Sequence, residues 1–280
     1  QGKLYAEELC VAQNDVALEG YTEDTELHSA ALFDLTGERV LYSYKAHERL
    51  YPASTTKIMT ALLAIENANL DDQVTISGNA DASSFSADAQ VCGLAKGEVW
   101  TLRDLLGALL LYSGNDAATA IAEYVGGSEE AFVNMMNRRA QELMANGTHF
   151  MNPHGLHDDN HYTTAYDLYL IFNECIKHDF VNIIQSEAYT AYYTDVDGNS
   201  QEALFTPTNL YAQGEVDVPE NVTIVGGKTG TTDEAGYCLI LMEKDSSDNP
   251  YISIVMGASE KPVLYEDMTS LIEAIPSGQQ

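Results

Sequence analysis

Hydrophobic and polar residues alternate along residues 26–50, and the pair Thr36-Gly37 interrupts the alternation near its middle. A period of two is typical of strands that bury one face, and a short glycine-containing break fits the turn between two strands. We therefore predict a β-hairpin in this segment. Three further strand-like runs follow one another near the end of the chain, at 222–232, 235–245 and 251–259.

Between these strands the apolar positions recur with helical spacing. A helix is expected to begin near Ser54 and to run to about Asn67. Ser128, followed by Glu130 and other acids, has the composition of a capping box at a helix start, and Gly147 is the expected end of that helix. The other predicted helices are at 101–113, 117–125, 163–178 and 264–275.

Strands at both ends of the chain with helices between them predict an α+β fold. The terminal segments, about 20–66 and 187–280, would share one antiparallel sheet flanked by helices. The segment from about 67 to 186 would form an inserted all-helical lobe. Together they would make a single domain over residues 1–280, and the interface between its lobes is a usual place for a ligand site.

The charge of the chain limits its partners. The 13 lysines and arginines stand against 43 aspartates and glutamates, which gives a formal net charge of -30. A polyanion repels phosphate backbones and anionic lipid surfaces, so neither nucleic acid nor direct membrane contact is expected. No segment approaches the roughly 20 apolar residues of a membrane span.

The four cysteines, Cys10, Cys92, Cys175 and Cys238, lie far apart and form no C-x-x-C pair. This spacing argues against a clustered metal site or a redox motif. Buried free thiols and two disulfides are both compatible with it.

Three short motifs carry the candidate chemistry. The first is Ser54 and Lys57, three residues apart where a helix begins, so that both side chains project from one face. A lysine can act as the base for a serine nucleophile if burial or a second cation lowers its pKa. The N–H groups of the helix start could hold a developing oxyanion. The structural alternative is an N-cap serine beside a solvated lysine.

The second motif, Ser113 and Asn115, occupies a break between two apolar helices. A hydroxyl there can pass a proton, and a side-chain amide can hold both a substrate carbonyl and a lysine ammonium. The alternative is an ordinary turn in which Asn115 or Asp116 caps the next helix.

The third motif lies in the run VGGKTGTT. Its glycines let another backbone approach a strand edge. Lys228 would supply a fixed cation, and Thr229 and Thr231 would supply hydroxyl and N–H groups for a carboxylate or an oxyanion. The alternative is a β-turn with a surface lysine.

Taken in order, S-x-x-K, S-x-N and K-T-G resemble the motif set of penicillin-binding proteins and class A β-lactamases. The stretches YPASTTKIMTALLAIE, LLLYSGNDAATAIAE, NPHGLHDDNHYTTAYDL and GGKTGTT are similar to those of the D-alanyl-D-alanine carboxypeptidases, which are low-molecular-mass penicillin-binding proteins. The resemblance covers roughly residues 25–275. It implies the serine β-lactamase/penicillin-binding-protein fold, with one transpeptidase-like catalytic domain that removes the terminal D-alanine from peptidoglycan stem peptides.

The resemblance also implies catalytic roles. Ser54 would be the acylated nucleophile and Lys57 its base. Ser113 would pass a proton to the leaving D-alanine, and the N–H groups of Ser54 and Thr231 would form the oxyanion hole. Water would then hydrolyse the acyl-enzyme, whereas β-lactam antibiotics would leave a slow acyl adduct on the same serine. No metal or organic cofactor is implied.

A second set of residues would bind the stem peptide that ends in D-Ala-D-Ala. Asn115 would bind its amide, and Lys228 would tune the site electrostatically. Thr229 and Thr231, with Gly230 between them, would bind the terminal carboxylate. Family members often carry an arginine beyond this strand, but the last arginine here is Arg139. Lys261 or the threonines would have to serve instead.

The resemblance implies work outside the cytoplasmic membrane, on its cell-wall side, where stem peptides are found. The family's β-rich second domain and amphipathic anchor are not recognisable in these residues. We therefore expect an export signal before Gln1 and an anchor after Gln280 in the full gene product.

Three alternatives remain to be weighed. A class A β-lactamase deacylates with a loop glutamate, but between Glu142 and Glu174 the chain has only Asp158, Asp159 and Asp167 as acids. A zinc site could use His154, His157 and His161 of the NPHGLHDDNH loop. A non-enzymatic wall-binding or penicillin-sensing module would keep the fold without turnover.

Overall fold

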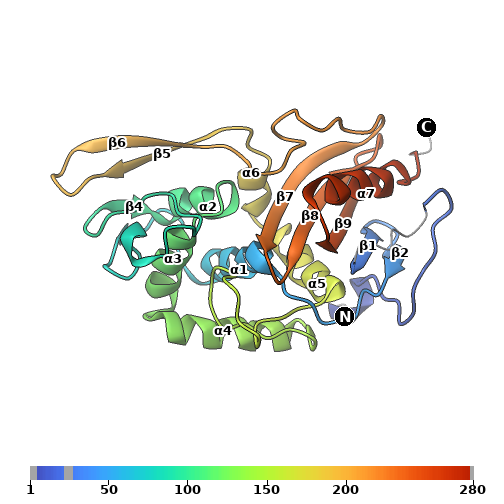
Figure 1. Ribbon diagram of the computed structural model, residues 1–280, viewed down its shortest axis with the longest axis horizontal. Coiled ribbons are helices and arrows are strands. Elements are labelled where there is room, and N and C mark those ends of the chain that lie inside the picture. The colour runs from blue at the N-terminus through green and yellow to red at the C-terminus, as the bar shows by residue number, and fades with distance from the viewer. Residues whose placement is uncertain (1–4, 22–27, 278–280) are drawn as a thin grey trace, which may run out of the picture.

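The computed structural model describes residues 5–21 and 28–277 of the chain (Figure 1). The strands are β1 (Ser29–Asp34), β2 (Arg39–Tyr44), β3 (Gln73–Thr75), β4 (Val99–Thr101), β5 (Tyr189–Thr194), β6 (Ser200–Phe205), β7 (Thr223–Thr232), β8 (Gly236–Lys244) and β9 (Pro250–Ala258). The α-helices are α1 (Lys57–Asn67), α2 (Leu102–Leu110), α3 (Asn115–Gly126), α4 (Glu129–Glu142), α5 (Ala165–Cys175), α6 (Phe180–Ile184) and α7 (Lys261–Glu273). The short 3-10 helices are η1 (Tyr5–Glu8), η2 (Ala53–Thr56) and η3 (Ala82–Ser84).

The two ends of the chain meet in one antiparallel sheet with the strand order β2-β1-β9-β8-β7. β1 pairs with β2, as the predicted hairpin, and with β9 from the end of the chain. Because side chains alternate along a strand, Ala31 and Phe33 enter one hydrophobic core while Ala30 and Leu32 enter another. α5 packs on the first side of this sheet and α7 on the second (Figure 1). The predicted α+β fold, with a helix-flanked antiparallel sheet, is confirmed.

Helix α1 is the centre of the inserted helical part. It contacts α2, α3, α4, α5 and α6, and its residues from Lys57 to Ala64 are all buried. A helix that is surrounded in this way has no solvated face to carry charge. A lysine at its first position is therefore unusual, and it points to a special environment.

Helix α4 ends earlier than its sequence indicates. Ser128 caps its start, with Oγ accepting a hydrogen bond from the N–H of Ala131 at 3.0 Å. The predicted end at Gly147 is wrong, because Met144 adopts a left-handed conformation with φ of 62°. The N–H of Ala145 then donates to the carbonyl of Ala140 at 2.8 Å, which is the bond that closes a Schellman motif.

A second sheet, with the order β3-β4-β5-β6, was not predicted. The hairpin β5–β6 extends along the helical part of the molecule at the left of Figure 1. It pairs with β4, which comes from the segment assigned to the helical lobe, and Trp100 of β4 stacks on Tyr193 of β5 with ring centroids 4.4 Å apart. The lobe boundaries near residues 67 and 187 stay a prediction.

Two further observations concern membrane contact and cysteines. None of the helices in residues 5–21 and 28–277 is long and apolar enough to cross a membrane. All four cysteines are free thiols, and three of them, Cys10, Cys175 and Cys238, are buried.

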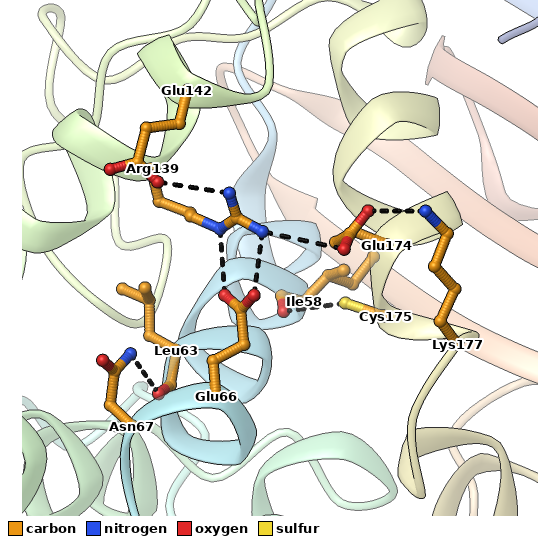
Figure 2. Close-up of polar contacts among 9 residues, drawn as sticks. All are labelled: Ile58, Leu63, Glu66, Asn67, Arg139, Glu142, Glu174, Cys175 and Lys177. Atoms are coloured by element: carbon orange, nitrogen blue, oxygen red, sulfur yellow. Dashed lines mark hydrogen bonds and ion pairs between the residues drawn. The ribbon is translucent and has the colours of Figure 1, made fainter. Parts of the chain in front are cut away.

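An ion-pair cluster joins α1, α4 and α5 (Figure 2). The guanidinium of Arg139 donates two hydrogen bonds to the carboxylate of Glu66, at 2.9 and 2.8 Å. It also donates to Glu142 at 3.2 Å and lies 3.7 Å from Glu174. The side chain of Arg139 is only 20% exposed, so this bidentate pair is partly shielded from water.

We predict that Arg139→Gln lowers the free energy of unfolding by about 2 kcal/mol, because it removes the cation of the partly buried carboxylate of Glu66, whereas Glu174 keeps Lys177 at 2.9 Å. Urea denaturation measures this loss. Arg39→Gln is the matched control, since Arg39 pairs with Asp34 but has a side chain that is 63% exposed. That variant should lose less than about 1 kcal/mol. Equal losses in the two variants would contradict the prediction.

Glu243 of β8 is a buried carboxyl away from any cation in the described part of the chain. It is 0% exposed and points to the same side of the sheet as Leu239 and Leu241. Ser253 donates a hydrogen bond to Oε2 at 2.9 Å, while Oε1 has no hydrogen-bond partner among the described residues. Burial raises the pKa of Glu243 well above its ordinary value, so the neutral acid is the form that suits the folded protein.

Ionisation of Glu243 should lower the free energy of unfolding as the pH rises. The pKa of a glutamate in the unfolded chain is about 4.3, so the stabilisation of the neutral acid is complete below that pH and is lost as the pH rises toward the folded pKa. We predict that Glu243→Gln, which cannot ionise, gains stability relative to the native protein by about 1.4 kcal/mol per pH unit in that window. Urea denaturation at pH 5, 6 and 7 tests this, with exposed Glu202→Gln as control. A difference that does not change with pH would refute it.

Candidate active site

Ser54 lies in η2, a 3-10 turn that leads directly into α1. Residues three apart are eclipsed in a 3-10 turn, and Nζ of Lys57 accordingly lies 2.8 Å from Oγ of Ser54. The N-cap position of α1 is occupied by Thr56, not by Ser54. Ala53, directly before Ser54, has a φ of 50°, a conformation that a residue with a Cβ keeps only where its surroundings enforce it.

The amine of Lys57 contacts four groups from three other segments of the chain. Besides Ser54 it contacts Oδ1 of Asn115 at 2.7 Å, Oγ of Ser113 at 3.2 Å and the backbone carbonyl of His154 at 2.9 Å. Lys57 is 0% exposed. The alternative of a solvated lysine at this position is therefore wrong.

The turn between α2 and α3 presents Ser113 and Asn115 to this amine. Ser113 has a left-handed φ of 66°. Helix α3 begins at Asn115 itself, with Gly114 in the N-cap position. Neither Asn115 nor Asp116 is therefore the N-cap residue, and the buried side chain of Asn115 faces Lys57 instead of the helix end.

Lys228 approaches the same group from β7, the outer strand of the five-stranded sheet. It is 1% exposed, so it is not the surface lysine of a β-turn. Its Nζ donates to Oγ of Ser113 at 2.9 Å and to the carbonyl of Thr229 at 2.8 Å. Ser113 thus lies between two buried lysines.

The remaining K-T-G residues belong to β7 and lie beside η2, the turn that carries Ser54. A Cβ added at Gly230 would lie 2.8 Å from the backbone nitrogen of Ser54, so glycine is what allows β7 to come this close. The hydroxyls of Thr229 and Thr208 are hydrogen-bonded at 2.6 Å. Thr231 is exposed on the same strand.

Residues 151–161 form a loop that packs against η2. The three motifs predicted no role for this loop in the site. Its His154 carbonyl contacts Lys57, and the hydroxyl of Thr60 donates to the carbonyl of Pro153 at 2.6 Å. Gly155, with φ of 96°, packs where any Cβ would collide with the carbonyl of Ala53. A backbone carbonyl leaves no mark in a side-chain motif, so the sequence offered no signal for His154.

The histidines of this loop have partners within the protein. The N–H of Met151 donates to Nδ1 of His161 at 2.9 Å, so Nε2 carries the proton and donates to Thr56 at 2.7 Å. Burial lowers the pKa of His161 to about 4 and that of His154 to about 3. His157 pairs with Asp159 at 2.9 Å.

In the part of the chain that the structure describes, one other group could in principle share a cation, namely Glu66, Glu174 and His178. Both carboxylates already face the guanidinium of Arg139 (Figure 2). A cation there would have to displace that arginine. Neither set of residues therefore supports the zinc alternative.

Burial lowers the pKa of both lysines, and the charge of Lys228 lowers that of Lys57 further. Burial, followed by the charge of Lys228, lowers the pKa of Lys57 well below its ordinary value, and the charge of Asp116 partly opposes this. Burial lowers the pKa of Lys228 to about 7. A neutral amine in contact with a serine hydroxyl is the arrangement that makes a nucleophile.

The comparisons with known proteins agree with this geometry. The family model described as D-alanyl-D-alanine carboxypeptidase, peptidase family S11, matches residues 17–260. The carboxypeptidase DacF of Bacillus subtilis is 34% identical over 253 residues, which are 89% of this chain and 61% of DacF. DacC of Escherichia coli is 32% identical over 86% of this chain and 59% of its own length. The chain thus spans about 60% of the length of these curated relatives.

A solved structure extends the likeness to three dimensions. The DD-transpeptidase of Streptomyces K15 superposes with a TM-score of 0.82 at 28% sequence identity, over 90% of this chain and 98% of that one. The penicillin-binding-protein fold expected from the motifs is therefore confirmed. On the evidence of the family match and of these relatives, the chain belongs to the D-alanyl-D-alanine carboxypeptidase family.

Proposed function

We propose that the protein is a serine D,D-carboxypeptidase that removes the terminal D-alanine from peptidoglycan stem peptides through an acyl-enzyme on Ser54. The observation that carries this proposal is the buried amine of Lys57, 2.8 Å from Oγ of Ser54. Family membership supports the same reaction, since DacF and DacC are D-alanyl-D-alanine carboxypeptidases by name.

Acylation begins at the amine of Lys57. A neutral amine has two hydrogens and one lone pair. The hydrogens can bond to the carbonyl of His154 and to Oδ1 of Asn115, which leaves the lone pair facing Oγ of Ser54. Lys57 takes the hydroxyl proton as Oγ attacks the carbonyl carbon of the penultimate D-alanine. The N–H groups of Ser54 and Thr231 stabilise the oxyanion that forms.

Ser113 completes the step. It lies 3.2 Å from Nζ of Lys57, so it can give its own proton to the leaving nitrogen while it receives the proton that Lys57 took. The C–N bond breaks and D-alanine departs as a neutral amine. Water then attacks the ester carbonyl and loses a proton to Lys57. The ester C–O bond breaks as Lys57 returns that proton to Oγ of Ser54, which releases the shortened peptide with a new carboxyl group and restores the serine.

The terminal carboxylate of the substrate is proposed to bind at Thr229 and Thr231, with Asn115 on the amide and the charge of Lys228 nearby. Thr208 supports Thr229 through the hydroxyl contact at 2.6 Å. Lys261, the other candidate for the missing arginine, lies at the start of α7 in a groove with Leu210 and Val216. None of the candidate site residues lines this groove, so the position of Lys261 favours Thr229 and Thr231 as the groups that bind the carboxylate.

The partners follow from this chemistry. They are stem peptides ending in D-Ala-D-Ala and β-lactams, whose strained amide presents the same carbonyl to Ser54. We propose an extracytoplasmic location, because the family's substrate is exposed on the cell-wall side of the membrane.

We predict that Ser54→Ala abolishes both acylation by a labelled penicillin and release of D-alanine from a D-Ala-D-Ala peptide. Intact mass and a D-alanine assay follow the two events. Thr208→Ser is a matched control, because it keeps the hydroxyl that contacts Thr229. An adduct on Ser54→Ala would overturn the assignment. Adduct formation without D-alanine release by the native protein would favour the penicillin-sensing alternative, and turnover of penicillin many times per second would favour a β-lactamase.

We predict a bell-shaped pH dependence of kcat/KM. The rate should rise as Lys57 loses its proton, at a pH well below the 10.4 or so of free lysine. It should fall again as Lys228, whose pKa in the free protein is about 7, loses the charge that attracts the carboxylate. Lys57→Arg should be nearly inactive, since arginine keeps its proton, while exposed Lys45→Arg should retain full activity. A rate that does not change between about pH 5 and 10 would exclude a lysine base.

A further inference from the structure

Asp116 is a buried carboxylate next to the catalytic residues that the proposed mechanism does not use. It is 0% exposed and follows Asn115 in the first turn of α3. Its hydrogen-bond partners include no lysine or arginine. A charge without a contacting counter-ion is costly to bury, so its stabilisation must come from elsewhere.

Backbone N–H groups provide that stabilisation. Oδ1 accepts hydrogen bonds from the N–H of Cys92 and of Ala117, both at 3.0 Å, and from the thiol of Cys92 at 3.1 Å. Oδ2 accepts from the N–H of Gly93 at 3.0 Å and of Leu94 at 2.9 Å. Every one of these neighbours is a donor, which matches an ionised carboxylate and not an amide or a protonated acid.

These bonds fasten residues 90–95 to the turn that carries the second motif. The N–H of Asn115 donates to the carbonyl of Gln90 at 2.9 Å. A Cβ added at Gly114 would lie 2.9 Å from both Oδ1 of Asp116 and Sγ of Cys92. The segment and the turn are therefore in direct contact, with Asp116 between them.

The charge of Asp116 also acts on the catalytic amine. The groups that face Lys57 from the packed elements are Lys228 of β7, Asp116 of α3, Cys92 of residues 90–95 and His154 of the 151–161 loop. Lys228 disfavours a second positive charge there, whereas the carboxylate of Asp116 favours it. Burial favours the neutral amine of Lys57 most, Lys228 adds to this effect, and Asp116 opposes it.

We propose that Asp116 is a positioning residue for the acylation reaction: it holds residues 90–95 against the turn that presents Ser113 and Asn115, and it supplies a buried negative charge that opposes the effect of Lys228 on Lys57. This inference rests on the proposed function. It assigns Asp116 an electrostatic part that a purely structural cap would not have.

The test is the pH dependence of the second-order rate of acylation by a fluorescent penicillin. In Asp116→Asn the amide places N–H groups against backbone donors, so the rate should fall about tenfold or more. Loss of the anion also lowers the pKa of Lys57, so the acid limb of the profile should move to lower pH by about one unit. Asp116→Glu keeps the charge but displaces it, so its rate should fall while its acid limb stays within about half a unit of the native position.

Asp167→Asn is the matched control, because Asp167 is likewise a buried carboxylate in the first turn of a helix that accepts a backbone N–H, here from Gly147 at 2.9 Å, and it is not among the groups that face Lys57. Its acid limb should stay at the native position. An Asp116→Asn protein with the native acid limb would overturn the proposal, even if its rate were lower. If Asp116→Asn does not fold, judged by its melting temperature, Asp116→Glu decides: a native rate overturns the proposal. A native protein that takes up no penicillin would instead refute the proposed function on which the inference rests.

Discussion

The structure depends on keeping the amine of Lys57 buried and hydrogen-bonded. Lys57 is the first residue of a helix that is enclosed by five others, and its Nζ meets groups from η2, the α2–α3 turn and the 151–161 loop. A buried amine without partners would cost several kcal/mol. Each of these segments therefore has to be held in position, and Lys228 from the sheet completes the enclosure through Ser113. The sheet and the helices are thus joined at the atoms of the candidate active site.

The sequence predicted the parts of this arrangement that depend on side chains. Five candidate site residues could be named because their residue types and spacing carry the signal, namely Ser54, Lys57, Ser113, Asn115 and Lys228. The structure links them by hydrogen bonds, since Lys57 contacts Ser54, Ser113 and Asn115, and Lys228 contacts Ser113. The hairpin β1–β2, strands β7 to β9 and most helices could be predicted because each has a clear period.

The features that could not be predicted from the sequence depend on backbone atoms and on pairing partners that lie far away along the chain. The carbonyl of His154 has no residue-type signature, and the left-handed turn at Met144 ends α4 without a glycine. Strands β3 and β4 have three residues each, too few for a period to emerge. They pair with each other, and β4 also pairs with β5, whose Thr194 lies 95 residues beyond its partner Val99.

Two glycines described above have a consequence for how this site can change. Gly230 and Gly155 press on the backbone of Ser54 and Ala53 from opposite segments, and neither position has room for a Cβ. The walls around Ser54 are therefore main chain, which point mutation cannot reshape without moving a strand or a loop. Selection for a different ligand is left with the rim of the site, where exposed side chains such as Thr231 can be exchanged while the enclosed amine keeps its surroundings.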